Sequence, residues 1–404
     1  MQTARPPLRV VATEKEFLIT DSGTQLVDGL SSWWTACHGY NHPHIQSAIL
    51  QQTQVMPHVM LGGITHPQVE RLCQRLNQLF PHPLNHIFLA NTGSESVEIA
   101  MKMAIQSGIH QGRRPKSFIH FQHAYHGDTI YAMSVCDPEE GMHAIFGDTL
   151  PKQLMLPIPQ TEEDFKQLET VILKRNAEIA GVIIEPLVQG AGGMKMHPPP
   201  ILKRIATLCQ KHRVCFIVDE IFTGFGRTGH LFAIHEADII PDIVCISKAL
   251  TGGTLPLAAV ICQEKLYQTF LSNDPQKAFM HGPTYMGNAL ACAAANASLD
   301  LFAENQWQHQ VKAISEQLCA GLTSLQSLGV VKEVRVKGAI GVVELDRPIG
   351  AHFNWFIERF LEKNVWLRPL GNIVYTTPCF TIRPQYLEQI IQSIHQTLSA
   401  WHPH

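Results

Sequence analysis

The chain carries little charge and has no long apolar run, and both absences narrow its possible functions. Only 16% of the 404 residues are charged, and the formal net charge is -3. Proteins that bind nucleic acid or an anionic membrane surface usually carry an excess of basic residues, so we expect neither partner. No apolar run approaches the roughly 20 residues that span a bilayer, and the opening residues lack the apolar core of a secretory signal. We therefore expect a cytoplasmic protein.

The sequence also lacks regular cysteine spacing and a metal-binding pattern. Its 10 cysteines include no Cys-x-x-Cys pair, so we expect reduced, mostly buried thiols rather than a disulfide framework. The 22 histidines raise the alternative of a metal site, with His120, His123 and His126 as candidate ligands. Their spacing crosses an expected strand-to-loop boundary and matches no zinc pattern, so we expect no metal.

Apolar residues are abundant, at 45% of the chain, which is enough for a large buried core. The length leaves room for about two or three domains, or for one large domain and a small one. Two short apolar runs stand out, because 214–218 leads into Asp219-Glu220 and 243–247 leads into Lys248. Such runs are typical of buried parallel strands. Ligands bind at the carboxyl ends of these strands in open α/β sheets, so a carboxylate and an amine are expected at one site.

An acid and an amine in one site indicate pyridoxal phosphate, which needs a Schiff-base lysine and an acid beside its pyridinium nitrogen. A nucleotidase is one alternative, but the sequence contains no Gly-x-x-x-x-Gly-Lys-Ser/Thr loop. A dinucleotide-binding enzyme is another, because 224–229 fits Gly-x-Gly-x-x-Gly. That fingerprint must follow a strand directly, and here 219–223 intervene. The plainest interpretation of Lys248, a solvated loop lysine, stays open at this point.

Expected strands and helices alternate through the middle of the chain, which predicts a parallel, doubly wound α/β sheet. The expected strands are 86–90, 117–121, 181–185, 214–218, 243–247 and 255–262, and the expected helices are 66–80, 95–107, 162–179 and 200–212. After about residue 305 the pattern changes to that of a small α+β domain, which the N-terminal hairpin within 8–30 is expected to join. The predicted division is 1–37 with 286–404 for the small domain and 38–285 for the large one.

The segment Asn91-Thr92-Gly93-Ser94 is expected to join a strand to a helix. Backbone N–H groups at a helix N-terminus, with the helix dipole, favour a phosphate at Gly93 and Ser94. A serine that only caps the helix explains the same residues.

Two aromatic features also belong to the expected site. Neighbouring side chains of a strand point to opposite sides, so Trp33 and Trp34 cannot both face one core. One of them is expected to line a cleft, unless both pack in an irregular loop. Tyr125, close to Gly127, is expected to lie as an aromatic plate at the mouth of the site.

Together these segments resemble the class III aminotransferases of the fold type I pyridoxal-phosphate enzymes. The likeness is carried by DGLSSWWTACHGYNHP, HVMLGGITH, AYHGDT, IIEPLVQGAGGM, DEIFTGFGRTGHLF, SKALTGG, FMHGPTYMGN, GAIGVVE and WLRPLGNIVY, between about residues 28 and 375. It implies a large domain with a mostly parallel, doubly wound sheet, a smaller α+β domain and a homodimer with sites at the subunit interface. It also implies ping-pong transamination on pyridoxal 5'-phosphate.

SSWW, HVMLGGITH and the HGPTYMGN loop are most similar to the branch of this family that acts in biotin biosynthesis. This similarity implies S-adenosylmethionine as amino donor and 8-amino-7-oxononanoate as acceptor, with 7,8-diaminononanoate as product. Another ω-amine or amino-acid aminotransferase, with lysine among its donors, is the close alternative, and a non-catalytic pyridoxal-phosphate-binding protein is the remote one. The sequence lacks the Trp-His-Pro-Tyr segment that precedes the hairpin in this family. Either the true start lies upstream, or one wall of the substrate site is missing.

The resemblance assigns a role to each matching residue. Lys248 is implied as the Schiff-base lysine and proton-transfer base, Asp219 as the partner of the pyridinium nitrogen, and Tyr125 as the third catalytic residue. The implied cofactor contacts are Ile221 under the ring, Tyr125 over it, Gly93 and Ser94 on the phosphate, and Thr284 from the other subunit. The implied substrate contacts are Trp33, Trp34, Gly282 and Tyr375 around the cleft, Arg368 on a substrate carboxylate and Arg227 near the amino donor.

Overall fold

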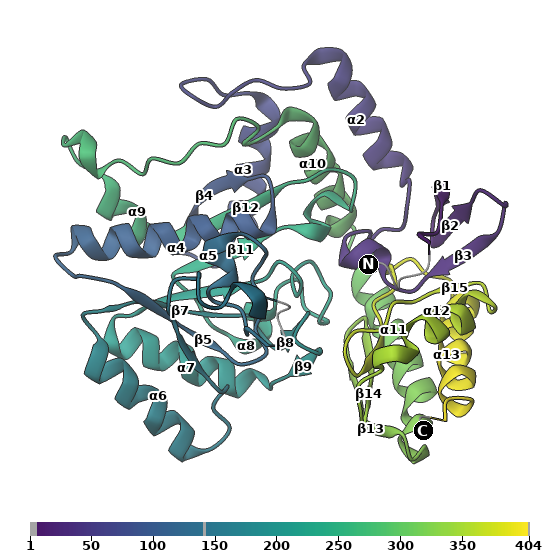
Figure 1. Ribbon diagram of the computed structural model, residues 1–404. Coiled ribbons are helices and arrows are strands. Elements are labelled where there is room, and N and C mark those ends of the chain that lie inside the picture. The colour runs from purple at the N-terminus through teal and green to yellow at the C-terminus, as the bar shows by residue number, and fades with distance from the viewer. Residues whose placement is uncertain (1–5, 140–142, 403–404) are drawn as a thin grey trace.

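A 7-stranded sheet forms the centre of the larger of two lobes (Figure 1). The computed structural model describes residues 6–139 and 143–402. In spatial order the strands are β4 (Leu84–Ala90), β12 (Ala258–Gln263), β11 (Ile243–Ile246), β10 (Cys215–Asp219), β7 (Ile179–Ile184), β5 (Ser117–Phe121) and β6 (Leu154–Leu156). The pairs β11–β10, β10–β7, β7–β5 and β5–β6 are parallel, whereas β12 runs antiparallel to both of its neighbours. The sheet is therefore mostly parallel.

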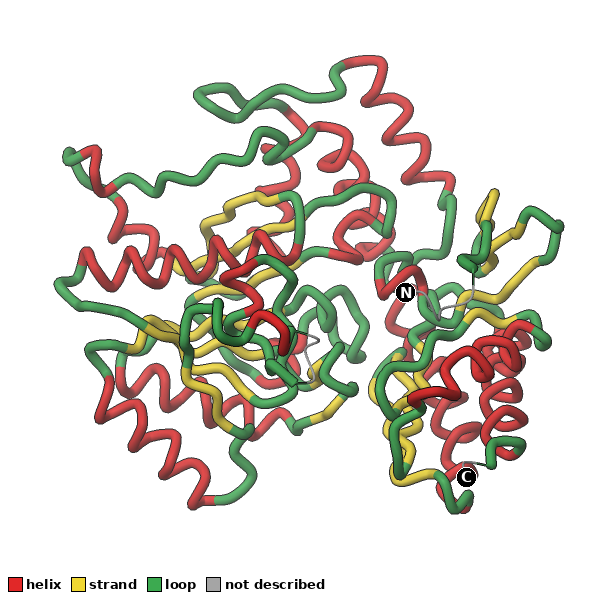
Figure 2. The backbone as a smooth tube through the Cα atoms, viewed as in Figure 1, coloured by secondary structure: helices red, strands yellow, loops and turns green. Residues whose placement is uncertain are grey.

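Helices cover both faces of this sheet (Figure 2). The helices of the larger lobe are α2 (Pro43–Val55), α3 (Pro67–Leu79), α4 (Gly93–His110), α5 (Ile130–Met133), α6 (Glu162–Arg175), α7 (Pro199–His212), α8 (Ala233–Ala237), α9 (Glu264–Tyr267) and α10 (Ala289–Ala303). Of these, α3, α4 and α7 pack on strands of the sheet, whereas α2 packs on α10. Side chains alternate along a strand, and β10 follows this rule. Phe216 and Val218 pack in the cluster that holds Leu202 of α7, whereas Ile217 packs in the cluster that holds Val97 of α4. The apolar run found in the sequence is apolar throughout because both faces are covered.

The smaller lobe is built from both the N-terminal and the C-terminal part of the chain. One of its sheets has the order β13 (Val331–Lys337), β14 (Ile340–Leu345), β16 (Ile373–Thr376), and the other has the order β1 (Val10–Glu14), β2 (Phe17–Thr20), β3 (Gln25–Asp28), β15 (Val365–Trp366). Its helices are α11 (Gln306–Leu322), α12 (Phe353–Leu361) and α13 (Pro384–Ser399). Because β15 pairs with β3, the expected N-terminal hairpin lies in one sheet with a C-terminal strand. The exact domain division stays a prediction, and α10 packs on α2 and α3 of the larger lobe.

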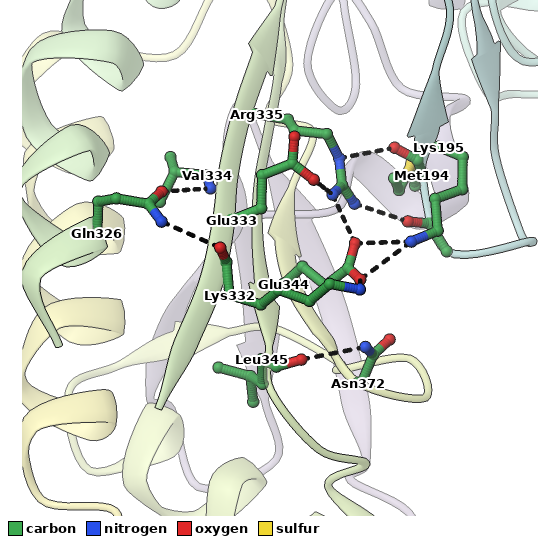
Figure 3. Close-up of polar contacts among 11 residues, drawn as sticks. Met194, Lys195, Gln326, Lys332, Glu333, Val334, Arg335, Glu344, Leu345 and Asn372 are labelled. Atoms are coloured by element: carbon green, nitrogen blue, oxygen red, sulfur yellow. Dashed lines mark hydrogen bonds and ion pairs between the residues drawn. The ribbon is translucent and has the colours of Figure 1, made fainter. Parts of the chain in front are cut away.

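A buried carboxylate ties the lobes together (Figure 3). Glu344 of β14 accepts hydrogen bonds from Lys195 at 2.8 Å, Lys332 at 2.9 Å and Arg335 at 2.5 Å. Lys195 belongs to the larger lobe, in the hairpin of β8 (Val188–Gln189) and β9 (Lys195–Met196). Arg335 also donates to the carbonyl of Met194, at 3.3 Å. Burial alone would raise the pKa of Glu344, but the three cations outweigh it and lower that pKa to about 2.

Helix ends differ from the expected ones by a few residues. The expected helix 95–107 is α4, which begins at Gly93 because the Thr92 side chain accepts the N–H of Glu95 at 3.2 Å. The expected helix 162–179 is α6, which ends at Arg175. Residue 179, the expected last residue of that helix, is the first residue of β7. Within the described ranges, no helix combines the length and the apolar character that crossing a membrane requires.

Candidate active site

A cavity of about 170 Å³ lies at the carboxyl ends of β10 and β11. Asp219 is the last residue of β10, and Lys248 opens the 3-10 turn η2 (Lys248–Thr251) that follows β11. Because these strands are adjacent and parallel, their carboxyl ends meet at one edge of the sheet. The structure thus brings the acid and the amine into one cavity. The other expected residues that line it are Gly93, Ser94, Tyr125, Ile221 and Trp34.

The Lys248 amine lies against aromatic surface. Its Nζ is 4.3 Å from the ring centroid of Trp34 and 5.9 Å from that of Phe222. Burial lowers the pKa of Lys248 to about 8, and the charges of Asp219 and Glu185 only partly oppose that effect. About one tenth of this amine is therefore neutral at pH 7, far more than of an ordinary lysine, and the neutral form is the one that a general base requires.

The Asp219 carboxylate is buried and is held on both oxygens. Its Oδ2 accepts from Nδ1 of His126 at 2.7 Å, and its Oδ1 accepts from the N–H of Ile221 at 3.1 Å. His126 is buried too, and its Nε2 has no hydrogen-bond partner among the described residues. The histidine bond fixes the orientation of the carboxylate toward the cavity. Within the same described ranges, no group of three or more histidine, cysteine or acidic side chains is arranged to hold a metal ion.

Glu185 is a second buried acid in the cavity wall. Its oxygens accept the N–H groups of Tyr125 and Gly190, each at 2.9 Å. Burial raises the pKa of Glu185 to about 7, and the nearby Asp219 charge acts in the same direction. Glu185 was not predicted from the sequence, although it follows the end of β7 as Asp219 ends β10. His126 was considered only as a metal ligand, and the structure places that side chain behind Asp219.

The N-terminus of α4 faces the same cavity, with Gly93 and Ser94 in its first turn. The interpretation of Ser94 as the helix cap is wrong, since Thr92 fills that role. Ser94 Oγ instead accepts the N–H of Asp128 at 3.1 Å. Gly127, at a φ of +130°, packs so closely that an added Cβ would lie 2.2 Å from Ser94 Oγ. Only glycine leaves this approach to the helix open.

The expected substrate residues are more scattered. Trp34 lines the cavity, but Trp33 is 62% exposed. Arg227 is 2% exposed, and its Nη1 donates to the carbonyls of Ala339 at 3.2 Å and Pro378 at 2.8 Å, while Nη2 has no partner among the described residues.

Four more expected residues lie outside the cavity of the single chain. Tyr375 is buried in β16, and Arg368 is exposed with its guanidinium 5.0 Å from the ring centroid of Phe353. Gly282 and Thr284 are exposed in the extended segment between α9 and α10 (Figure 1). Burial raises the pKa of Tyr375, and the charge of Arg368 opposes that shift.

A larger hollow, of about 700 Å³, lies at the opposite edge of the sheet, around Val214 at the start of β10. Lysines in its wall pair with acids, Lys203 with Asp238 at 2.7 Å and Lys265 with Asp242 at 2.5 Å. Ligands of α/β sheets bind at the carboxyl ends of the strands, away from this hollow. We therefore place the candidate active site in the smaller cavity.

Comparison with known proteins identifies the class. Residues 2–398 match the family model of class-III aminotransferases, so the chain belongs to this family and is a pyridoxal-phosphate-dependent transaminase. Adenosylmethionine-8-amino-7-oxononanoate aminotransferase of Corynebacterium glutamicum is 42% identical, over 97% of this chain and 93% of the relative. The enzyme of the same name from Methanocaldococcus jannaschii is 31% identical, with a TM-score of 0.92 over 98% of this chain and 93% of that chain.

A further solved structure connects the fold to the cofactor. An amine transaminase from an uncultivated Pseudomonas species, in its PLP-bound form, is 27% identical, with a TM-score of 0.91 over 98% of this chain and 95% of that chain. The expected family, fold type and cofactor are confirmed by these matches.

The residues of the cavity fit pyridoxal phosphate. An amine with a lowered pKa, a buried carboxylate and the N-terminus of a long helix meet in one space, and each suits a different part of this cofactor. An added Cβ at Gly93 would lie 3.1 Å from Ile221, so glycine keeps the space between them open. Buried nitrogens of Trp34 and His126 border the same cavity without a hydrogen-bond partner among the described residues.

Proposed function

We propose that this transaminase transfers an amino group to the keto carbon of 8-amino-7-oxononanoate, giving 7,8-diaminononanoate in biotin biosynthesis, with S-adenosylmethionine as donor. The main support is the 42% identity, over nearly the whole chain, to a relative named for this reaction. The joint presence of Lys248, Asp219 and Trp34 in one cavity supports the chemistry.

Each cofactor-binding residue takes one part of pyridoxal phosphate in this proposal. Asp219 would face the ring nitrogen and keep it protonated, Ile221 and Tyr125 would enclose the two faces of the ring, and Lys248 would attach the cofactor. The phosphate would be held by the N–H groups of Gly93 and Ser94, by the Ser94 hydroxyl and by Thr284 of the partner subunit.

Lys248 also moves the proton. Bound pyridoxal phosphate supplies a ring that accepts the electrons left behind when a proton leaves the substrate carbon. Lys248 Nζ takes this proton as its neutral amine, which its pKa of about 8 provides, and then delivers it. His126 keeps the Asp219 carboxylate aligned through its Nδ1–H, and the aromatic surface of Trp34 and Phe222 keeps water from the amine.

Recognition of the substrates falls to residues around the mouth of the cavity. Trp33, Trp34, Gly282 and Tyr375 enclose the cleft, and the exposed guanidinium of Arg368 binds the terminal carboxylate of the acceptor. Nη1 of Arg227 is used by two carbonyls, so only its other nitrogens remain for the donor.

A homodimer is part of the proposal. The segments 55–66 and 278–288 expose the apolar side chains of Val55, Met60, Ile64, Met280 and Tyr285. A second copy that covers them would remove this apolar surface from water and bring Thr284 and Gly282 to the partner's cavity. Light scattering on the purified protein should give twice the mass of one chain. All 10 cysteines are unpaired, which fits the proposed cytoplasmic location.

Product analysis tests the reaction. The protein, loaded with pyridoxal phosphate, is incubated with 8-amino-7-oxononanoate and either S-adenosylmethionine, lysine or an ω-amine, and diaminononanoate is measured by mass spectrometry. We expect product with S-adenosylmethionine. Product with lysine alone would change the donor, and turnover of other keto acceptors without diaminononanoate would favour another aminotransferase. Cofactor binding without conversion of any amine would favour the non-catalytic alternative.

A further inference from the structure

The short turn α1 (Ser31–Trp34) holds four consecutive residues in the left-handed region. The φ angles of Ser31, Ser32, Trp33 and Trp34 are 48°, 47°, 54° and 73°. Residues other than glycine rarely adopt this conformation, and a run of four persists only when the surrounding structure holds it. Backbone strain of this kind is concentrated at functional sites, so the side chains that stabilise this turn bear on the function of the site.

A buried carboxylate holds the turn. Asp28, at the end of β3, is 2% exposed and accepts from the N–H of Leu30 at 2.8 Å and from that of Ser32 at 2.9 Å. The hydroxyl of Tyr40 donates to the same carboxylate at 2.5 Å, and the Ser32 hydroxyl lies 2.5 Å from the Tyr40 hydroxyl. Asp28 and Tyr40 therefore fasten the turn at its first half, and neither side chain lines the cavity.

The second half of the turn carries the aromatic wall of the cavity. The Trp34 ring lies 4.2 Å, centroid to centroid, from that of Phe222 and 4.3 Å from the Lys248 amine. Trp34 is 8% exposed, whereas the adjacent Trp33 is turned outward. A regular helix or strand would point the two indoles differently, so their placement depends on the left-handed backbone.

We propose that Asp28 and Tyr40 form a clamp of positioning residues that holds the left-handed turn, and through it sets Trp33 and Trp34 against the substrate. The clamp acts on substrate binding more than on the chemical step, because Asp219 ends β10 and Lys248 opens the turn that follows β11, so both are positioned by the sheet rather than by α1. Only its effect on substrate rests on the proposed function.

Tyr40→Phe is the sharpest test, because it removes one hydroxyl and keeps the ring. In the holoenzyme we expect the KM for 8-amino-7-oxononanoate to rise about tenfold while kcat changes less than about threefold. Tyr267→Phe is the matched control, since this tyrosine stacks on His86 away from the cavity and should leave both constants unchanged. Asp28→Asn should raise KM at least as much as Tyr40→Phe.

A second readout does not depend on activity. Protein made with 5-fluorotryptophan gives one ¹⁹F resonance for each of 6 tryptophans, and Trp33→Phe and Trp34→Phe assign two of them. We expect Tyr40→Phe to shift or broaden these two resonances and to spare those of Trp307, Trp355 and Trp401. Trp366 is no control, because it pairs with Asp28 across β3 and β15.

The outcomes separate the clamp from the proposed function. Unchanged Trp33 and Trp34 resonances together with an unchanged KM would overturn the clamp, as would a uniform shift of all resonances with a lower melting temperature and no change in KM. If the wild-type protein made no diaminononanoate, the proposed function would fail, and the ¹⁹F spectra would still decide the clamp.

Discussion

The two halves of the candidate site are built differently. The cofactor half, defined as Gly93, Ser94, Tyr125, Asp219, Ile221 and Lys248, is assembled in one cavity of the single chain. The substrate half, defined as Trp33, Arg227, Gly282, Arg368 and Tyr375, lies outside that cavity and is spread over both lobes and an extended segment. The cofactor half depends on strand ends within one sheet, whereas the residues of the substrate half come from both lobes. Changes in the first half should therefore affect kcat, and changes in the second half should affect KM.

Lys248→Ala should have the largest effect. Losing a proton-transfer base lowers rates by about 10²–10⁴, and the covalent attachment of the cofactor is lost as well, so we expect kcat to fall at least about 10³-fold. Borohydride reduction followed by mass spectrometry should add the cofactor mass to the wild-type protein and not to the variant. Retention of transaminase activity above one hundredth of the wild-type rate would remove Lys248 from its role.

Asp219→Asn should lower kcat about 100-fold, because a neutral amide no longer stabilises the protonated ring nitrogen. The matched control is Glu220→Gln, since Glu220 is equally buried and points to the other side, where it bonds Thr223 and the N–H of Ile234. Glu220→Gln should lower stability by about 1–3 kcal/mol and spare kcat in the folded fraction. Equal losses of kcat in both variants would show that the effect is structural.

The cofactor half could be predicted from the sequence because its signals are local. A polar residue directly after a buried apolar run identified Asp219 and Lys248, and the same rule would have found Glu185. His126 was beyond that rule, because its bond to Asp219 joins residues 93 positions apart. Likewise, periodicity identified most strands of the sheet. It could not place β12 between β4 and β11, which requires knowledge of the sheet order.

The substrate half could not be predicted at this level. Which tryptophan faces the cavity depends on a left-handed turn that Asp28 and Tyr40 stabilise, and the hydrogen bond between these two residues, 12 positions apart, cannot be seen in a local pattern. Arg227 was expected near the amino donor from the resemblance, and the structure adds that its guanidinium is bonded to carbonyls of the smaller lobe. Gly282 is exposed in the segment between α9 and α10 and lies outside the cavity of the single chain, so its proposed role depends on the proposed dimer.

The apoprotein should become more stable as pH rises from about 8 to 10.5. The pKa of Lys248 is lowered by burial to about 8 from 10.5, so between these values the unfolded chain binds the proton more often than the folded one. The free energy of unfolding is therefore lowered by the Lys248 charge below pH 8 and rises by up to about 3 kcal/mol between pH 8 and 10.5. Urea unfolding at pH 7.5 and 10 measures this gain in the free energy of unfolding. Other titrating groups contribute equally to the wild-type protein and to Lys248→Met, so the difference between the two proteins gives the contribution of Lys248. An equal gain in both proteins would contradict the lowered pKa.

Arg368→Lys should act on KM. A lysine keeps the positive charge but loses the planar fork that binds a carboxylate through two hydrogen bonds, so the KM of the acceptor should rise about tenfold with kcat nearly unchanged. Arg359→Lys serves as control, because that arginine lies on α12 and pairs with Glu362, which directly follows the helix. A fall in kcat without a change in KM would place Arg368 in the cofactor half and contradict the division of the site into two halves.

Lys195→Met should have the smallest effect. It tests whether the contact between the two lobes keeps the residues of the substrate half in position. Lys195 and Lys332 bind the same carboxylate of Glu344, but only Lys195 crosses from the larger lobe, while Lys332 lies on β13 beside β14. If the relative position of the lobes sets the substrate cleft, Lys195→Met should raise KM about two- to threefold, and Lys332→Met should leave it unchanged despite a similar loss of charge at Glu344. Cofactor affinity, measured by titrating the apoproteins with pyridoxal phosphate, should be the same in both variants because the cofactor half lies in one lobe. Equal changes of KM in the two variants would mean that the charge at Glu344, rather than the connection between the lobes, influences the substrate half.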